Sequence, residues 1–185
     1  MTLTKQNIES LLILCKKGNQ LAQLEVYNRY QSSMYNVAVR IVKDTAEAED
    51  IMQESFLTAF NKLQMFKGDA SFGSWLKRIV INNSITQYKK SQRYVALPEY
   101  GLEEEVEESS FDGISEDEYT NTKAAQVLKC MDNLHDNYRQ ALTLHLIEGY
   151  DYEEVCEILQ ISYANCRTLI SRAKESLRNK LIVTT

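Results

Sequence analysis

The residues that could ligate a metal ion or act as nucleophiles are few in this sequence and poorly spaced for either task. The chain has four cysteines and two histidines, and no two cysteines form a C-x-x-C pair. Zinc ligands come in close pairs along a chain, so this spacing argues against a metal centre. His135 and His145 have no nearby Ser or Cys with an orienting acid, which argues against nucleophilic catalysis. We therefore expect no catalytic residue, no metal and no cofactor, and a protein that is not an enzyme.

The sequence does support binding of a polyanion, through residues 72–93. Cations alternate there with amides and an aromatic residue, which suits phosphate contact together with base stacking. A soluble helix whose basic end favours its own dipole explains the pattern equally well. The cations are Lys77, Arg78, Lys89, Lys90 and Arg93, and between them lie Asn82, Gln87 and Tyr88.

An acidic and polar set precedes that stretch at helical spacing. Asp50, Gln53, Glu54 and Leu57 fall at i, i+3, i+4 and i+7, so they share one face of a helix. A solvated polar face is the plainer explanation of the three polar residues. Leu57 on the same face favours a surface that docks on a partner protein.

A third set of polar and basic residues begins the last predicted helix. A short helix over residues 152–159, a turn at 160–162 and a longer helix predict a helix-turn-helix. The second helix of such a motif enters the major groove by its N-terminal end. A helical hairpin with a charged face is the alternative. The candidates for base and phosphate contact are Tyr163, Ala164, Asn165, Arg167, Thr168, Ser171, Arg172 and Lys174.

Capping residues and apolar periodicity predict the helices that carry these sets. Asp44 and Ser71 are the expected N-caps of the two long helices around the acidic and basic stretches. Asp151 with Glu154 predicts a capping box, and Ser162 is the expected N-cap of the last helix. The apolar stripe of the second long helix contains Phe72, Trp75, Leu76, Ile79, Val80 and Asn83.

Near the N-terminus, Thr4 is the predicted cap of a first helix that stops at Gly18. Asn19 opens the next helix, whose inner side we expect to contain Leu21, Leu24 and Tyr27.

Composition predicts an all-α protein of two small helical domains. Only 6 Gly and 1 Pro occur among 185 residues, while 44% of residues are hydrophobic and 25% are charged. Residues 94–118 contain ten acids and no base, which leaves 16 of the 26 acids against all 21 bases elsewhere. Such a segment repels itself and stays extended. We therefore expect a helical domain at residues 1–93, a flexible acidic linker at 94–118 and a helix-turn-helix domain at 119–185.

Two parts of the chain resemble a known family. The segments AEDIMQESFLTAF and FKGDASFGSWLKRI, followed by the basic end, resemble region 2 of the extracytoplasmic-function (ECF) sigma factors of the sigma-70 family. The segment from LHDNYRQ to SLRNKL resembles region 4 of the same family. Three positions depart from the family pattern: His135 stands where Pro is usual, Gln160 where Gly is common, and Leu169 where Arg is common.

The resemblance implies a sigma factor that binds core RNA polymerase, recognises −35 and −10 promoter elements and aids melting. Asp50, Gln53, Glu54 and Leu57 would face the clamp helices of the β′ subunit, and the residues after 162 would read the −35 element. The implied −10 contacts are Phe66, Lys67, Asp69, Lys77, Arg78, Asn82, Gln87, Tyr88, Lys89 and Lys90.

The same resemblance implies further partners and a location. It implies contact with the β flap of the polymerase and with an anti-sigma factor, which could itself be bound to a membrane. The scattered cysteines fit reduced thiols in the cytoplasm, and no apolar run is long enough to cross a membrane.

Two other functions are compatible with parts of the sequence. A helix-turn-helix regulator that acts without polymerase would explain the C-terminal half but would leave the acidic set without a role. An interaction module that ignores DNA, such as an anti-sigma mimic, would leave the basic residues without one.

Overall fold

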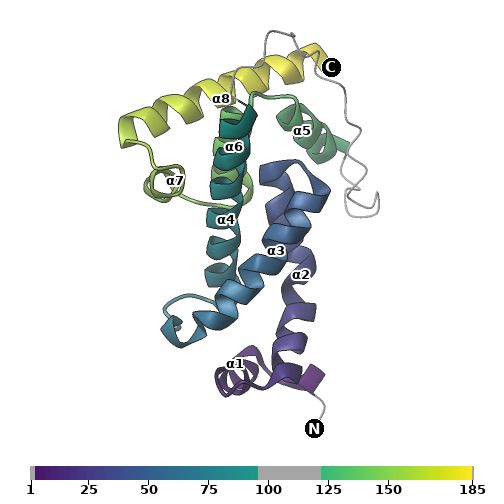
Figure 1. Ribbon diagram of the computed structural model, residues 1–185. Helices are drawn as coiled ribbons and strands as arrows, with labels where there is room; N and C mark the ends of the chain where they lie inside the picture. Colours follow the sequence, from purple (N-terminus) through teal and green to yellow (C-terminus); the bar gives the residue numbers. More distant parts are fainter. Residues whose placement is uncertain (1–2, 96–121, 185) are drawn as a thin grey trace. The chain divides into compact units, whose positions relative to one another are not determined.

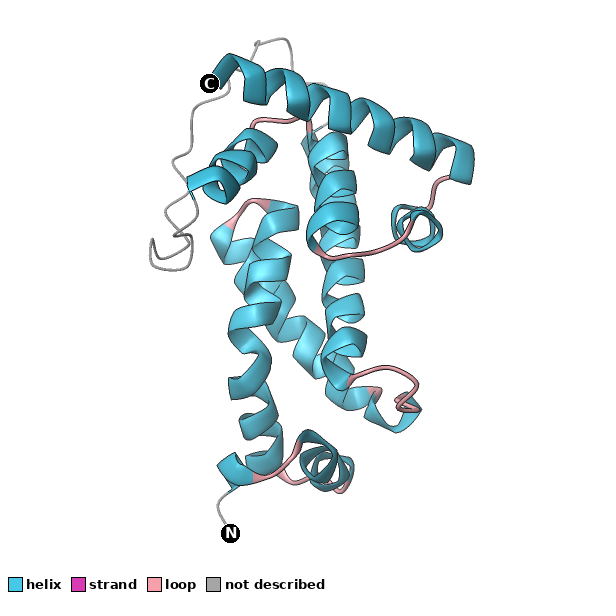
Figure 2. Ribbon diagram, turned by 180° about the vertical axis from the view of Figure 1, so that it is seen from behind, coloured by secondary structure: helices cyan, strands magenta, loops and turns pink. Residues whose placement is uncertain are grey.

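The computed structural model describes residues 3–95 and 122–184, and both ranges consist of helices joined by short loops (Figure 1). No strand occurs within these two ranges (Figure 2). The chain divides into two compact units, Met1–Leu97 and Pro98–Thr185. The predicted all-α class with two helical units is thus confirmed. The predicted linker lies outside the described residues, except for residues 94 and 95.

In the first unit, three long helices pack against one another in pairs, and a short helix closes one end. The packing pairs are α2 with α3, α2 with α4, and α3 with α4, while α1 packs on α2. The buried side chains are mostly aliphatic, with Leu11, Ile41, Leu76 and Ile81 fully enclosed. The elements are η1 (Leu3–Lys5), α1 (Ile8–Lys16), α2 (Gln20–Val42), α3 (Thr45–Asn61), η2 (Leu63–Met65) and α4 (Phe72–Val95).

In the second unit, the long last helix packs against three shorter ones. Helix α8 contacts α5, α6 and α7, and its inner stripe of Cys166, Ile170, Ala173 and Leu177 is buried. The elements are α5 (Thr122–Asp132), α6 (Asp136–Leu142), η4 (Thr143–Ile147), α7 (Tyr152–Leu159) and α8 (Tyr163–Thr184).

The segment η4 continues α6 as a π-helix. Its wider turn is closed by a hydrogen bond from the Glu148 backbone N–H to the Thr143 carbonyl, 2.9 Å long. The helix then ends at Gly149, which adopts a left-handed φ of +81°. The left-handed glycine explains the stop, but the widened turn before it has no signal in the apolar pattern.

Polar side chains cap the predicted helix starts, with one exception. Asp44 accepts a hydrogen bond of 2.7 Å from the Glu47 N–H, and Asn19 accepts one of 3.0 Å from the Ala22 N–H. The predicted caps of the later helices are also confirmed: Ser71, Ser162, and Asp151 with both capping-box bonds.

The exception is the first helix. Thr4 lies in η1, and Asn7 caps α1 by accepting a 2.9 Å bond from the Ser10 N–H, so the predicted cap was wrong. Arg29 of α2 explains why the chain turns before Asn7. Its guanidinium donates to the carbonyl oxygens of Gln6, Leu3 and Thr4, which holds this segment in a short turn of its own.

The predicted inner side of α2 was also wrong at its first turns. Leu21 is 67% exposed and Leu24 is 54% exposed, while Ala22 and Val26 are fully buried. Helix α1 packs on α2, and the residues buried in these turns of α2 are Ala22 and Val26. The apolar pattern alone therefore selected the wrong pair of residues in this part of α2.

Candidate functional surfaces

The acidic set forms one exposed face on α3, which we call the acidic face: Asp50, Gln53, Glu54 and Leu57. All four side chains are exposed, and Leu57 is 65% exposed. Asp50 and Glu54 form no hydrogen bond or ion pair within the described residues. Helix α3 therefore presents two uncompensated carboxylates beside an exposed leucine, a combination that suits a partner with basic and apolar groups.

The opposite side of α3 is tied to α4 by a buried polar contact. Ser55 donates to the Ile51 carbonyl at 2.6 Å and accepts a 2.9 Å bond from the Asn83 amide. Ser55 is fully buried and Asn83 is half-buried. Because Asn83 immediately follows Asn82, the contact fixes how the acidic face of α3 is placed relative to the candidate residues on α4.

The loop between η2 and α4 is held at its base and open at its tip. The ring of Phe66 lies 5.2 Å from that of Trp75 and 5.8 Å from that of Phe72. The Lys16 ammonium donates to the Phe66 carbonyl at 3.5 Å. The tip, residues 67–70, is exposed, and its Gly68 has a left-handed φ of +86°. Phe66 thus anchors the loop, and Lys67 and Asp69 lie at its surface.

The candidates on α4 do not share one face. At about 100° per residue, Arg78, Asn82 and Lys89 fall within about 40° of one another around the helix. Asn82 is exposed, while Arg78 and Lys89 are half-buried with contacts of their own. The other four lie roughly 100° or more from the centre of this face: Lys77, Gln87, Tyr88 and Lys90.

Sequence reasoning missed Trp75 as a member of this group, because it assigned Trp75 to the apolar stripe. Trp75 is half-buried and continues the face of Arg78, Asn82 and Lys89 toward the loop. A signal was present, since Trp75 stands three, seven and fourteen residues before those three. With Phe66 it places two aromatic rings between the loop and the basic residues of α4.

Helix α8 presents its candidates on one broad exposed side. Arg167 and Arg172 lie about 140° apart around the helix, with Ala164 and Ser171 between them. All four are exposed, and neither arginine has an ion pair within the described residues. The same side includes the exposed Glu175, one turn beyond Ser171. The part of α8 suited to a polyanion is thus limited to its first three turns.

The remaining −35 candidates lie around this centre. Tyr163 is 53% exposed at the helix start, and Asn165 is exposed. The Thr168 hydroxyl donates back to the Ala164 carbonyl at 3.0 Å, which leaves its oxygen free to accept only. Lys174 is half-buried at the edge of the exposed side.

The turn between α7 and α8 contains a backbone conformation that its sequence does not favour. Gln160 has φ 59° and ψ 47°, in the left-handed region, as expected for a residue standing where Gly is common. The ring of Tyr152 on α7 lies 4.9 Å from that of His145 on η4 and 6.2 Å from that of Tyr163 on α8, and it is tilted against both. His145 is half-buried, and its Nδ1 lies 3.0 Å from the Tyr150 carbonyl.

The other unusual position, His135, also has a structural role. It is the N-cap of α6, where its Nδ1 accepts a 3.4 Å bond from the Asn137 N–H. No described helix is both long enough and apolar enough to cross a membrane.

Comparison with known families and proteins gives a consistent result over both units. A family model described as Sigma-70 region 2 matches residues 26–94, and one described as Sigma-70, region 4 matches residues 124–177. The chain is 32% identical over 181 residues to the ECF RNA polymerase sigma factor SigW of Bacillus subtilis, covering 90% of this chain and 92% of that protein. It is 29% identical to the RNA polymerase sigma-H factor of Pseudomonas aeruginosa, covering 97% and 96%.

Two solved structures resemble the fold. CnrH, solved in complex with the cytosolic domain of CnrY, has a TM-score of 0.55 at 21% identity, covering 95% of this chain and 97% of that chain. The sigma factor RpoE of Bartonella quintana, solved with the anti-sigma factor NepR, has a TM-score of 0.56 at 19% identity, covering 87% and 97%. At these identities the structures bear on the fold alone.

Proposed function

Because this chain belongs to the ECF sigma factors of the sigma-70 family and directs RNA polymerase to initiate transcription at specific promoters, we propose a division of that work among its surfaces. The factor is not itself an enzyme, since the polymerase performs the chemistry. The observation that carries the proposal is the exposed acidic face of α3, which lies outside the core stripe of the same helix.

The acidic face binds core polymerase, at the clamp helices of the β′ subunit. Asp50 and Glu54 have no partner in the described residues, so both carboxylates attract a basic surface. Salt limits this attraction to short distances. Leu57 supplies apolar area that is removed from water when the partner docks. A polymerase-independent regulator would have no use for this combination on α3.

The −10 element is held by the loop and by α4. Lys67 at the loop tip and the face of Arg78, Asn82 and Lys89 supply cations and an amide for phosphate and base-edge contacts. Phe66 and Trp75 offer ring surface on which an unpaired base can stack, which favours the melted strand over the duplex. The candidates on the other sides of α4, such as Lys77 and Tyr88, contact the sugar-phosphate backbone of the duplex beside the −10 element.

The −35 element is read by α7 and α8 acting as a helix-turn-helix. Arg167 and Arg172 are spaced to reach base edges or phosphates on the two sides of the major groove. Ala164 and Ser171 are small enough to let the helix approach the bases closely. The second unit also meets the β flap of the polymerase.

An anti-sigma factor is the regulatory partner that we propose. RpoE of Bartonella quintana was solved with the anti-sigma factor NepR, and CnrH was solved with the cytosolic domain of CnrY. Exposed apolar side chains on the first unit, among them Leu21 and Leu24, are suited to such a partner. The factor works in the cytoplasm, where polymerase and promoter DNA are found.

The division of work is tested by transcription reconstituted with core polymerase, using one variant for each surface. Glu54→Arg should fail to bind core. Arg78→Ala with Asn82→Ala should bind core but leave the −10 region closed to permanganate, which oxidises unpaired thymines. Arg167→Ala should bind core and melt DNA. It should no longer transcribe more from a promoter with a −35 element than from a promoter without one. Loss of all three steps in every variant would overturn the division.

A further inference from the structure

Two cysteine side chains meet inside the α7–α8 unit, and we propose that they form a site of reversible oxidation. Hydrogen peroxide converts the thiols of Cys156 and Cys166 into an intramolecular disulfide, and this lowers the affinity of α8 for −35 DNA. The second half of this proposal rests on the proposed function of α8.

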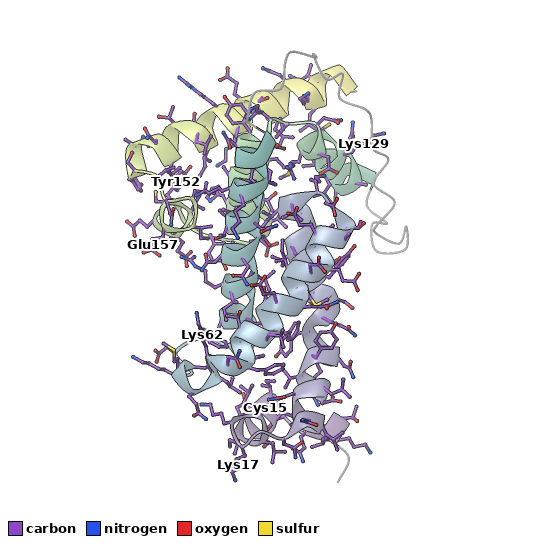
Figure 3. The ribbon with its side chains drawn as sticks, viewed as in Figure 1. Cys15, Lys17, Lys62, Lys129, Tyr152 and Glu157 are labelled. Carbon is purple, nitrogen blue, oxygen red and sulfur yellow. The ribbon has the colours of Figure 1, made fainter. Side chains whose placement is uncertain are left out.

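The fold brings the two thiols together from adjacent helices. Cys156 is on α7 and Cys166 is on α8, and these two helices pack against each other. The Cys166 thiol donates at 3.6 Å to the carbonyl of Tyr152, which lies one turn before Cys156 on the same side of α7, and Cys156 is close enough to help raise the pKa of Cys166. Tyr152 and Glu157, both labelled on α7 in Figure 3, lie about 140° apart around that helix.

The two thiols differ in solvent exposure, and this difference determines which of them reacts with peroxide first. Cys156 is half-buried, whereas Cys166 is fully buried. Burial raises the pKa of the Cys166 thiol to about 11, so that it remains protonated at neutral pH. Peroxide therefore meets Cys156 first, and Cys166 is the thiol held in place to react second.

The chemistry balances with peroxide as the only oxidant. The Cys156 sulfur attacks one peroxide oxygen, the O–O bond breaks, and the products are Cys156 sulfenic acid and one water. The Cys166 sulfur then attacks the Cys156 sulfur, the S–O bond breaks, and the departing hydroxide takes the Cys166 proton as a second water. Each sulfur is oxidised by one electron, and peroxide is reduced by two.

The new bond must alter the position of α8. A disulfide holds its sulfur atoms at about 2 Å, closer than two thiols in van der Waals contact lie. Cys166 immediately precedes Arg167, so the movement occurs where α8 would meet the bases. Recognition contacts tolerate shifts of only about 0.5 Å, so oxidation should weaken binding. Disulfides in cytosolic proteins are usually transient ones that act as sensors, which suits this role.

The other two cysteines provide internal controls. Cys15 is buried in α1 of the first unit, and Cys130 is buried in α5. Trypsin cleaves after Lys16, Lys129, Arg139 and Arg167, so the peptide of residues 140–167 contains Cys156 and Cys166 and no other cysteine.

The experiment treats the folded full chain with limiting hydrogen peroxide, removes the peroxide, unfolds the chain in denaturant, blocks free thiols with iodoacetamide, and maps tryptic peptides by mass. The peptide of residues 140–167 should be lighter by two hydrogens and resist alkylation, while the peptides of Cys15 and Cys130 should be alkylated. Dithiothreitol should reverse the change. Alkylation of both thiols in peptide 140–167 after peroxide treatment would overturn the proposal.

The second measurement is fluorescence anisotropy with a −35 duplex. The oxidised wild type should bind about tenfold more weakly, the size of one lost base-edge contact, and dithiothreitol should restore binding. Cys156→Ser should bind like the reduced wild type and ignore peroxide. A disulfide that leaves affinity unchanged would overturn the regulatory half. Failure of the reduced protein to bind would instead overturn the proposed function of α8, and the peptide masses would still decide the oxidation.

Discussion

Arg167 and Arg172 are the two side chains on α8 with the clearest role at the scale of single residues. Both are exposed, and both lie in the first three turns of the helix. Arg167→Ala and Arg172→Ala should each weaken binding to −35 DNA. Loss of a base-edge contact should cost about 1–3 kcal/mol and relax sequence preference, whereas loss of a phosphate contact should mainly lower the salt slope by about 1.

Binding measured at several salt concentrations separates these outcomes. Lys17→Ala is a matched control, because it also removes one exposed positive charge but from the end of α1 (Figure 3). The control should bind −35 DNA like the wild type. If both arginine variants match the wild type at every salt concentration, α8 does not meet the DNA by this side.

The backbone conformation of Gln160, rather than its side-chain contacts, determines its effect on stability. Its φ of 59° costs a residue with a Cβ atom about 1 kcal/mol that glycine does not incur. Gln160→Gly should therefore raise the free energy of unfolding of the second unit by about 0.5–1 kcal/mol. Gly149→Ala should lower it, because Gly149 has a φ of +81°. Chemical denaturation of the two variants checks the opposite signs, and equal signs would contradict the account.

At the scale of elements, the contact of Ser55 with Asn83 joins α3, which we propose docks on polymerase, to α4, which we propose contacts DNA. Ser55→Ala and Asn83→Ala should each destabilise the first unit by about 1 kcal/mol. The double variant should cost less than the two single costs together, because the second substitution removes a partner that is already lost. A double-mutant cycle by urea denaturation measures this coupling, and strict additivity would mean that the bond does not hold α3 against α4.

Elements were predictable from the sequence where one local signal determined them. Asp44, Asp151 and Ser162 cap helices in the predicted places because a short polar side chain can satisfy the free N–H groups of a first turn. The acidic face was predictable because helical spacing alone places its members together. The confirmed parts of the prediction therefore depend on contacts within a few residues of the chain.

The parts that the sequence did not predict depend on contacts between distant residues. Leu21 and Leu24 are exposed because the packing of α2 buries Ala22 and Val26 instead, which no periodicity in α2 reveals. Thr4 is not a cap because Arg29, a residue far along the chain, holds its carbonyl. Trp75 was assigned to the core because an aromatic residue at helical spacing is usually buried, whereas its neighbours leave it half-buried.

At the scale of the whole molecule, the acids of residues 94–118 are the dominant charge feature. These acids lie outside the described ranges, and in the sequence the ten of them stand against an excess of five bases in the rest of the chain. We expect this segment to compete with DNA for the basic end of α4.

Replacing Glu103, Glu104, Glu105, Glu107 and Glu108 by Gln should raise the affinity of the free protein for promoter DNA at low salt. The gain in affinity should fade as salt rises, because at 0.15 M salt charges more than about 8 Å apart are largely screened from one another. Unchanged affinity at low salt would make the segment a spacer.

The central claim is that α3 docks on core polymerase through its acidic face. The direct test is the binding of core enzyme to Glu54→Arg and to Glu49→Arg, measured side by side. Both residues are exposed acids on α3, but they lie about 140° apart around the helix, and only Glu54 is on the acidic face. The account predicts that Glu54→Arg, and more strongly Asp50→Arg with Glu54→Arg, loses core binding at unchanged helicity, while Glu49→Arg keeps it. Normal core binding by the double variant would contradict the account.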